Sequence, residues 1–247
     1  MPSALTGKTA LVTGAGKRLG RALALALADA GVHVALHYRN ARAEAEATVD
    51  AVCARGVCAW LFSADLSDAG AAERLFDGVC AAAGEVDFLI NNASVFPEDT
   101  LPAMSLESLW DNVRVNAYAP FALGRRLAAQ QRPGAIVNLL DARIVDYDAA
   151  HASYHVSKRM LDTLTRMMAV EFAPLVRVNA VAPGLILPPE GKDEAYLEGL
   201  AHTNPLQRHG GAEDVCEAAL FLLRGDFVTG QTIFVDGGRH LRGGMYG

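Results

Sequence analysis

The sequence lacks both a long nonpolar run and an excess of basic charge. None of its apolar stretches approaches the roughly 18 residues that a transmembrane helix requires, and its first residues lack the charged segment and apolar core of a secretory signal. The formal net charge is −6, so the composition indicates no nucleic-acid-binding surface. We therefore expect a cytoplasmic protein with neither a membrane nor a nucleic-acid partner.

Cysteine is also scarce, and low-complexity sequence is absent. The four cysteines, Cys53, Cys58, Cys80 and Cys216, form no CxxC pattern. We interpret them as reduced packing residues and expect no metal site. Neither an internal repeat nor a linker-like change in composition divides the 247 residues. One domain is the simplest interpretation.

Short β-rich segments alternate with alanine- and leucine-rich segments along the whole chain. This alternation is typical of βαβ units, and continuously apolar strands are typical of a sheet covered on both faces. We predict an α/β fold over residues 1–247, a single Rossmann-type domain whose doubly wound parallel sheet has about seven strands with helices on both faces. The expected strands are Thr9–Thr13, Val32–His37, Val57–Phe62, Phe88–Asn91, Ala135–Leu139, Val176–Val181 and Thr232–Val235. The expected helices lie near 19–30, 41–55, 69–83, 105–130, 152–173, 193–201 and 212–224.

Two irregular segments interrupt this alternation. Pro183–Gly191 follows the sixth expected strand and is rich in helix-breaking residues. Ligands of open parallel sheets bind beyond the carboxyl ends of the strands, so we expect a substrate loop near 184–205, beginning at Leu185. The glycine-rich tail Asp236–Gly247 either frays or docks on a neighbouring subunit.

A glycine-rich turn joins the first expected strand to the first expected helix. It runs from Thr13 to Gly20, and such a turn lets the backbone approach a pyrophosphate while the helix N-terminus offers free N–H groups. The predicted dinucleotide contacts in it are Gly14, Lys17, Arg18, Leu19 and Gly20.

The end of the second expected strand indicates which dinucleotide binds. A carboxylate there would favour NAD, but the chain reads His37-Tyr38-Arg39-Asn40 and has no carboxylate until Glu44. Arg39 can pair with a 2′-phosphate, with Lys17 in the neighbouring turn. We therefore expect NADPH. After the third strand, Asp65-Leu66 offers a carboxylate to the adenine amino group.

Tyr154 and Lys158 lie four residues apart in a helix expected from Ala152 to Phe172, so both side chains are on one helical face. A nearby ammonium lowers the pKa of a phenol and makes it usable in acid–base chemistry. Taken alone, this spacing also occurs in surface helices without function.

Taken together, the ordered motifs resemble the short-chain dehydrogenase/reductase family. They are the glycine turn, Asn91-Asn92-Ala93-Ser94, Asn116, Tyr154-x-x-x-Lys158 and Pro183-Gly184. The resemblance implies that Tyr154 donates a proton and that Lys158 binds the nicotinamide ribose and lowers the tyrosine pKa. It also implies that Asn116 holds a proton-relay water, that residues 91–93 line the cofactor, and that the protein is a homotetramer.

Three departures from the family pattern resemble its pteridine reductase subgroup. Arg18 replaces the middle glycine of the turn, Ser94 replaces a glycine, and Asp141 replaces the catalytic serine. His37-Tyr38-Arg39 and Phe96 fit the same subgroup. The resemblance implies NADPH-dependent reduction of a dihydropterin, or of an oxidised pterin or folate. It also implies that Arg18 and Ser94 contact both cofactor and pterin, and that Phe96 stacks on the pterin.

The chemistry of Asp141 bears on the substrate. A carbonyl oxygen becomes negative during reduction and needs a hydrogen-bond donor, which a carboxylate is not. A pterin C=N bond gains a proton on nitrogen, which a carboxylate can assist. Two alternatives remain, a reductase of another carbonyl or imine and a non-catalytic NADP(H)-binding sensor. We expect His151 and His155, beside Tyr154, to be packing or surface residues.

Overall fold

The computed structural model describes residues 5–189 and 191–242. Seven parallel strands form one sheet in the order β3-β2-β1-β4-β5-β6-β7. The strands are β1 (Thr9–Val12), β2 (His33–Tyr38), β3 (Ala59–Ser63), β4 (Phe88–Asn91), β5 (Gly134–Leu139), β6 (Val176–Pro183) and β7 (Thr232–Val235). This confirms the predicted seven-stranded, single-domain α/β fold.

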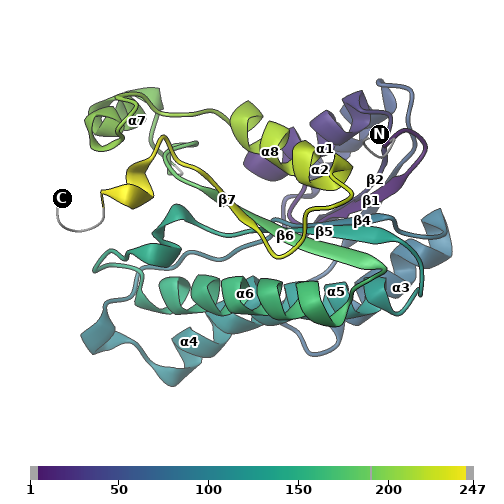
Figure 1. The fold of residues 1–247 in the computed structure, drawn as a ribbon, viewed down its shortest axis with the longest axis horizontal. Helices are drawn as coiled ribbons and strands as arrows, with labels where there is room; N and C mark the ends of the chain where they lie inside the picture. Colours follow the sequence, from purple (N-terminus) through teal and green to yellow (C-terminus); the bar gives the residue numbers. More distant parts are fainter. Residues whose placement is uncertain (1–4, 190, 243–247) are drawn as a thin grey trace.

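Helices cover both faces of the sheet (Figure 1). One layer consists of α1 (Arg18–Asp29), α2 (Arg42–Cys53) and α8 (Ala212–Arg224). The other consists of α3 (Ala71–Ala83), α4 (Leu106–Val113), α5 (Ala119–Ala128) and α6 (Ala152–Glu171). The short α7 (Glu194–Leu200) lies beyond the carboxyl end of β6. Short helical turns complete the chain: η1 (Leu101–Ala103), η2 (Arg114–Tyr118), η3 (Ala142–Val145), η4 (Ala201–Thr203) and η5 (Arg239–Leu241).

A nonpolar core lies on each side of the sheet because the central strands are buried on both faces. Alternate residues of β1 show this: Ala10 and Val12 pack toward α1 and α8, whereas Leu11 packs toward α3 and α5. Strand order reverses at β1, whose neighbours are β2 and β4. From β1 the chain continues to β2 on one side, and from β4 it continues to β5 on the other, which is the arrangement at which such sheets form a ligand-binding crevice.

The helix expected over 105–130 differs from the prediction in its middle. It divides into α4 and α5, joined by η2, a π-helical turn that contains Asn116. Pro120 gives a physical reason. It has no N–H to donate to the carbonyl of Asn116 four residues earlier, and its ring crowds that carbonyl. Single π-turns within helices are frequent at functional sites.

The cysteines, the segment after β6 and the C-terminal tail were also predicted from the sequence. Cys53 and Cys58 are exposed, so their expected role in packing is wrong, whereas Cys216 is buried. The segment after β6 is irregular before α7 begins, as expected for the loop near 184–205, although Glu190 lies outside the described residues. Of the tail, residues 243–247 also lie outside them. Across residues 5–189 and 191–242, no helix has the length and apolar composition to cross a membrane.

Candidate active site

Two glycines shape the turn after β1, and any other residue at either position would push neighbouring backbone atoms aside. Gly14 has φ +65°, and a Cβ there would lie 3.0 Å from the Cα of Ala93. A Cβ on Gly20 would lie 2.0 Å from the carbonyl oxygen of Gly14. The turn therefore presents bare backbone, which is the surface that a pyrophosphate group needs.

Residues after β4 hold the turn in place. The Asn92 side-chain amide donates to the carbonyls of Thr13 and Gly14, at 3.0 and 3.1 Å. In return, the Thr13 hydroxyl accepts from the N–H groups of Asn92 and Ala93, both at 3.0 Å. The loops after β1 and β4, which flank the crevice, are thus joined by four hydrogen bonds.

His37, at the end of β2, is a further support of the turn. Its Nδ1 accepts from the Gly14 N–H at 3.2 Å, and its Nε2 lies 3.1 Å from the carbonyl of Ala64. These partners require a neutral ring with the proton on Nε2. Burial lowers the pKa of His37, against opposing effects of Ala64 and Asp65, and so favours this neutral form.

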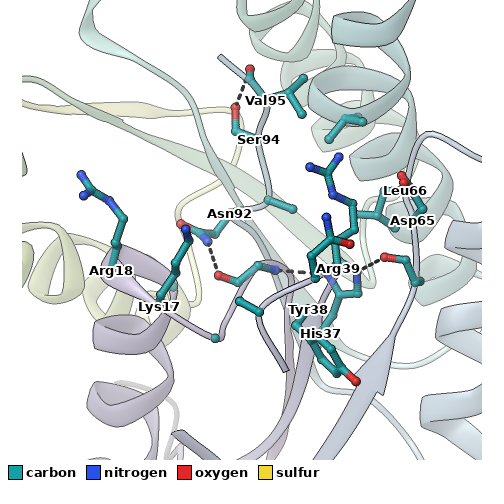
Figure 2. Close-up of a pocket in the computed structure, with 18 of the residues that line it drawn as sticks. Lys17, Arg18, His37, Tyr38, Arg39, Asp65, Leu66, Asn92, Ser94 and Val95 are labelled. Atoms are coloured by element: carbon teal, nitrogen blue, oxygen red, sulfur yellow. Dashed lines mark hydrogen bonds between the residues drawn. The ribbon is translucent and has the colours of Figure 1, made fainter. Parts of the chain in front are cut away.

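These elements enclose a cavity of about 450 Å³, within the range of ligand pockets. Its lining contains the predicted cofactor residues Gly14, Lys17, Arg18, Leu19, Gly20, His37, Tyr38, Arg39, Asn40, Asp65, Leu66, Asn92, Ala93 and Ser94. Figure 2 shows Lys17 and Arg39 directed into the space above the turn. The lining also includes residues that sequence reasoning missed: Gly16, Ala41, Ala64, Val95 and Val115. The position of Gly16 within the glycine turn was a signal for its role, whereas the other four are small or apolar side chains that the sequence does not distinguish from core residues.

Arg18 has an unusual backbone. Its φ is +53°, in the left-handed region that favours glycine, and this explains why a glycine suits this position. Its guanidinium donates to the carbonyl of Pro188 in the segment after β6. Arg18 therefore connects the phosphate-binding turn to the expected substrate loop.

Asp65 lies on the opposite side of the cavity. Its Oδ1 accepts from both the N–H and the hydroxyl of Ser67, at 2.9 and 2.7 Å. The Ser67 hydroxyl is the main reason that the pKa of Asp65 is lowered. The carboxylate is thus ionised and held in one orientation, and its Oδ2 is the atom that could accept from an adenine amino group.

The predicted catalytic residues Asp141 and Tyr154 lie at the carboxyl end of β5 and the start of α6. The Tyr154 hydroxyl donates to Oδ2 of Asp141 at 2.9 Å, and Oδ1 of Asp141 accepts from the Arg143 N–H at 2.7 Å. Tyr154 is 7% exposed. A phenol and a carboxylate are therefore paired where the family usually pairs a tyrosine with a serine.

This pairing overturns one expectation. The pKa of Tyr154 is raised well above its usual value, first by burial and then by the charge and hydrogen bond of Asp141. Lys158 lies on the same face, with its Nζ 5.7 Å from the centre of the Tyr154 ring. Its Nζ donates instead to the carbonyl of Leu139 at 2.7 Å, and burial lowers its own pKa to about 8. The predicted lowering of the tyrosine pKa is wrong for this structure, because burial and then the charge and hydrogen bond of Asp141 raise that pKa.

Asn116 is fully buried at the π-turn and joins three elements. Its Oδ1 accepts from the Ser94 hydroxyl at 3.0 Å and from the Val95 N–H at 2.8 Å. Its Nδ2 donates to the Val95 carbonyl and to the Ser157 hydroxyl, both at 3.0 Å. Asn116 therefore ties Ser94, at the rim of the cofactor cavity, to the helix that carries Tyr154.

Phe96 lies between Tyr154 and His151. Its ring stacks on His151 with centroids 3.8 Å apart and meets the edge of Tyr154 at 4.5 Å. Phe96 is still 53% exposed, so part of the ring remains open to a substrate. The Nδ1 atom of His151 also lies 2.8 Å from a carboxylate oxygen of Asp148.

Asp99, which sequence reasoning missed, stabilises the start of α6. The helix has no side-chain cap from its own N-cap residue, His151. Asp99 replaces that cap from a distant segment, because its carboxylate accepts from the N–H of Ser153 at 3.0 Å and from the Ser153 hydroxyl. The position of Tyr154, one residue later, depends on this contact.

Four other predicted residues fall outside the cavity lining. Asn91 is buried and donates to Asn138 at 2.8 Å, so its expected place beside the cofactor is wrong. Pro183 ends β6, and Gly184 is required because a Cβ there would lie 2.5 Å from that of Asp236. Leu185 is half-buried beside them, and its carbonyl accepts from the Gly210 N–H.

Comparisons with known proteins indicate the family of the chain. A family described as enoyl-(acyl carrier protein) reductase matches residues 14–240. The chain is 34% identical to the 3-oxoacyl-[acyl-carrier-protein] reductase FabG of Staphylococcus aureus over 243 residues, covering 95% of this chain and 98% of that one.

Two solved structures are similar in fold and sequence. FolM alternative dihydrofolate reductase 1 from Brucella canis, complexed with NADP, superposes with a TM-score of 0.89 at 31% identity, covering 97% of this chain and 96% of that one. The promiscuous reductase LugOII, which catalyses keto-reduction in lugdunomycin biosynthesis, gives a TM-score of 0.88 at 33% identity, covering 97% and 100%.

Proposed function

These matches span nearly the whole chain, so the chain belongs to the short-chain dehydrogenase/reductase family, and we propose a pterin as its substrate. As a member of this family the protein is an oxidoreductase whose cofactor is NADP(H). The proposed reaction converts a dihydropterin to a tetrahydropterin. Oxidised pterins and folates are further candidate substrates of the same site.

We assign cofactor binding to the residues around the glycine turn and to the ends of β2, β3 and β4. Arg39 and Lys17 are the proposed ligands of the 2′-phosphate, because both are cations directed into the cavity. Asp65 is the proposed acceptor for adenine, and Lys158 the proposed donor to the nicotinamide ribose. Pro183 and Gly184 would bound the nicotinamide end, where β6 ends.

The observation that carries the pterin proposal is the hydrogen bond between Tyr154 and Asp141. Carbonyl reduction leaves a phenolate after the tyrosine gives up its proton, and the adjacent carboxylate opposes that charge, as the raised pKa of Tyr154 indicates. A pterin ring that carries an N–H or an added proton is instead attracted by the carboxylate. Bound NADPH would supply the hydride to a ring carbon. Tyr154 and Asp141 would orient the ring, and the Tyr154 hydroxyl would pass its proton to the ring nitrogen while it regains one from solvent, so that no phenolate is left beside Asp141.

The remaining substrate contacts follow from the positions around this pair. Ser94 and Arg18 lie on the rim shared with the cofactor cavity, and Phe96 offers a partly exposed ring beside Tyr154. Leu185, after β6, is proposed to contact the far side of the pterin. Asn116 is proposed to act with them by holding Ser94 and a relay water.

A carbonyl reductase is the second candidate. It is favoured by the similarity to FabG and to LugOII, whose names refer to the reduction of oxoacyl and keto groups. Purified protein should therefore be tested for NADPH oxidation with dihydrobiopterin, dihydromonapterin, dihydrofolate and several ketones. Turnover of ketones alone would refute the pterin proposal, and NADPH binding without any turnover would indicate a sensor.

We also propose a homotetramer. A row of nonpolar side chains along α6 is exposed to 39% or more: Val156, Met160, Met167 and Val170. Residues three or four apart form one stripe on a helix, and an exposed nonpolar stripe is typical of a surface that another subunit covers.

A further inference from the structure

Two arginines lie beside the Tyr154–Asp141 pair without a hydrogen-bond acceptor. Arg143 belongs to η3, directly after Asp141, and Arg239 begins η5, which packs against η3. Both residues are half-buried. Within residues 5–189 and 191–242, neither guanidinium donates a hydrogen bond, and the carboxylate paired with Arg143, that of Asp148, lies 3.9 Å away.

The turn that carries Arg239 is held rigidly. Buried Asp236 accepts from the Gly238 N–H at 3.0 Å and from the N–H and Nδ1 of His240 at 2.6 and 2.8 Å. Gly237 and Gly238 adopt positive φ values of +63° and +84°, which few other residues tolerate. Asp236 therefore fixes the backbone of the turn, and the guanidinium N–H groups of Arg239 remain available to another acceptor.

Carboxylates lie near this pair, but none in the described part of the chain accepts a hydrogen bond from either guanidinium: Asp141 and Asp236 act on Arg239, and Asp148 lies 3.9 Å from Arg143. Burial, followed by the positive charge of Arg143, lowers the pKa of Arg239, while Asp141 is the strongest opposing group. Yet both oxygens of Asp141 already accept hydrogen bonds, from Arg143 N–H and from Tyr154. Two partly desolvated guanidinium groups repel each other, and an anion bound between them would relieve that repulsion. The planar guanidinium can donate two parallel hydrogen bonds to a carboxylate.

We propose that Arg143 and Arg239 form a subsite for a carboxylate on the side chain of the substrate, beside the reacting ring. The inference rests on the proposed pterin reduction for the identity of that ring. It narrows the substrate class to ring systems with an acidic tail, such as the glutamyl tail of a folate. Neutral polyol tails would bind without this contribution.

Steady-state kinetics with dihydrofolate and with dihydrobiopterin tests the subsite in Arg143→Gln and Arg239→Gln. Each change should raise KM for dihydrofolate about ten- to hundredfold, the effect of one charge-assisted hydrogen bond, and should alter dihydrobiopterin kinetics less than about twofold. Arg242→Gln, on the same tail but bonded to the carbonyl of His202, is the matched control. Equal changes with both substrates, or none with dihydrofolate, would overturn the subsite.

Binding measurements separate this inference from the proposed function. The complex with NADP⁺ should bind p-aminobenzoyl-glutamate more tightly than its uncharged diamide, and Arg239→Gln should abolish the difference. If this preference is found but no pterin is reduced, the proposed function fails and the subsite stands. If pterins are reduced but the wild-type protein does not distinguish the two ligands, the subsite fails alone.

Discussion

At the scale of single residues, the pairing of Tyr154 with Asp141 is the feature on which the two proposed reductions differ. The phenol donates to a carboxylate at 2.9 Å, and both residues are held by further contacts from η3 and α6. A serine hydroxyl at this position would donate to a substrate oxygen, whereas the carboxylate can only accept while it is ionised. The two kinds of reduction therefore respond in opposite directions to one substitution.

We predict that Asp141→Ser loses pterin reduction by about ten- to hundredfold, because a charge-assisted contact is worth roughly 1.5–3 kcal/mol. Weak ketone reduction should appear or increase in the same variant. Asp141→Asn, which keeps the shape but not the charge, should lose pterin turnover without gaining ketone turnover. Turnover of both substrates by the three proteins is the measurement, and unchanged pterin kinetics in Asp141→Ser would contradict the proposed role.

Lys158 shows what a functional charge does to stability. Its pKa is lowered from 10.5 to about 8 by burial, so its contribution to folding stability falls as the pH decreases from 10.5 toward 8. At neutral pH this corresponds to roughly 3 kcal/mol of unfavourable free energy relative to a solvated ammonium.

We therefore predict that Lys158→Met raises the melting temperature of the cofactor-free protein at pH 7 while it weakens NADPH binding and abolishes most turnover. Calorimetry at pH 7 and pH 10 tests this, because the advantage of the variant should shrink at the higher pH. A variant less stable than wild type at both values would indicate that the Leu139 hydrogen bond outweighs the buried charge.

At the scale of elements, the glycine turn combines strain with function. Arg18 has a left-handed backbone at the start of α1, where a glycine would adopt the same φ without strain. The side chain in turn reaches Pro188 across the site. An arginine in this strained conformation is better explained by a role in binding than by a role in folding.

Arg18→Gly should stabilise the fold by about 1 kcal/mol, the usual difference for a non-glycine residue in this region. The same change should weaken NADPH binding and pterin turnover together. Arg18→Ala is the control, since it removes the guanidinium and keeps the strained backbone. A less stable Arg18→Gly protein would mean that the contact with Pro188 holds the folded state.

The stability of the same turn depends on pH through the protonation of His37. Its lowered pKa means that its stabilising effect is present above the usual value near 6.5 and is lost as the pH falls through the folded-state pKa. Protonation of Nδ1 would remove the acceptor for the Gly14 N–H.

NADPH affinity should therefore hold through the usual imidazole range and decrease only at lower pH, as the pH falls through the lowered pKa of His37 in the folded protein. His37→Asn places a non-titrating oxygen near the position of Nδ1 and should flatten this dependence while keeping affinity at pH 8 within about tenfold. Fluorescence titration of NADPH from pH 5 to pH 8 measures both. If NADPH affinity falls equally at low pH in the wild type and the variant, the titrating group is another residue or the cofactor phosphate.

At the scale of the whole molecule, the exposed stripe on α6 provides a test of assembly. Met160→Glu and Met167→Glu together place charges in the nonpolar row, and light scattering after gel filtration should show a smaller species than the tetramer that we propose for the wild-type protein. The exposed Leu106→Glu on α4 is a control away from the stripe. A wild-type protein that is already monomeric would refute the tetramer directly.

Much of the fold could be predicted because its signals are local. Each expected strand overlaps an observed strand, since buried parallel strands are short apolar runs between turn residues. The interruption at Asn116 was missed, although Pro120 was a visible signal. Propensity alone treats a proline near a helix centre as an end or a kink, and only packing around Asn116 makes it a π-turn.

The sequence by itself determined the fold class, the family and the residues that converge on the carboxyl ends of the strands, because spacing along the chain fixes which side chains share a turn or a helical face. Only the tertiary structure decided their electrostatics. The pKa of Tyr154 is raised first by burial and then by Asp141, and both effects depend on how η3 and α6 pack together. The approach of Arg239 to η3 likewise joins segments about a hundred residues apart, and no local pattern encodes that contact.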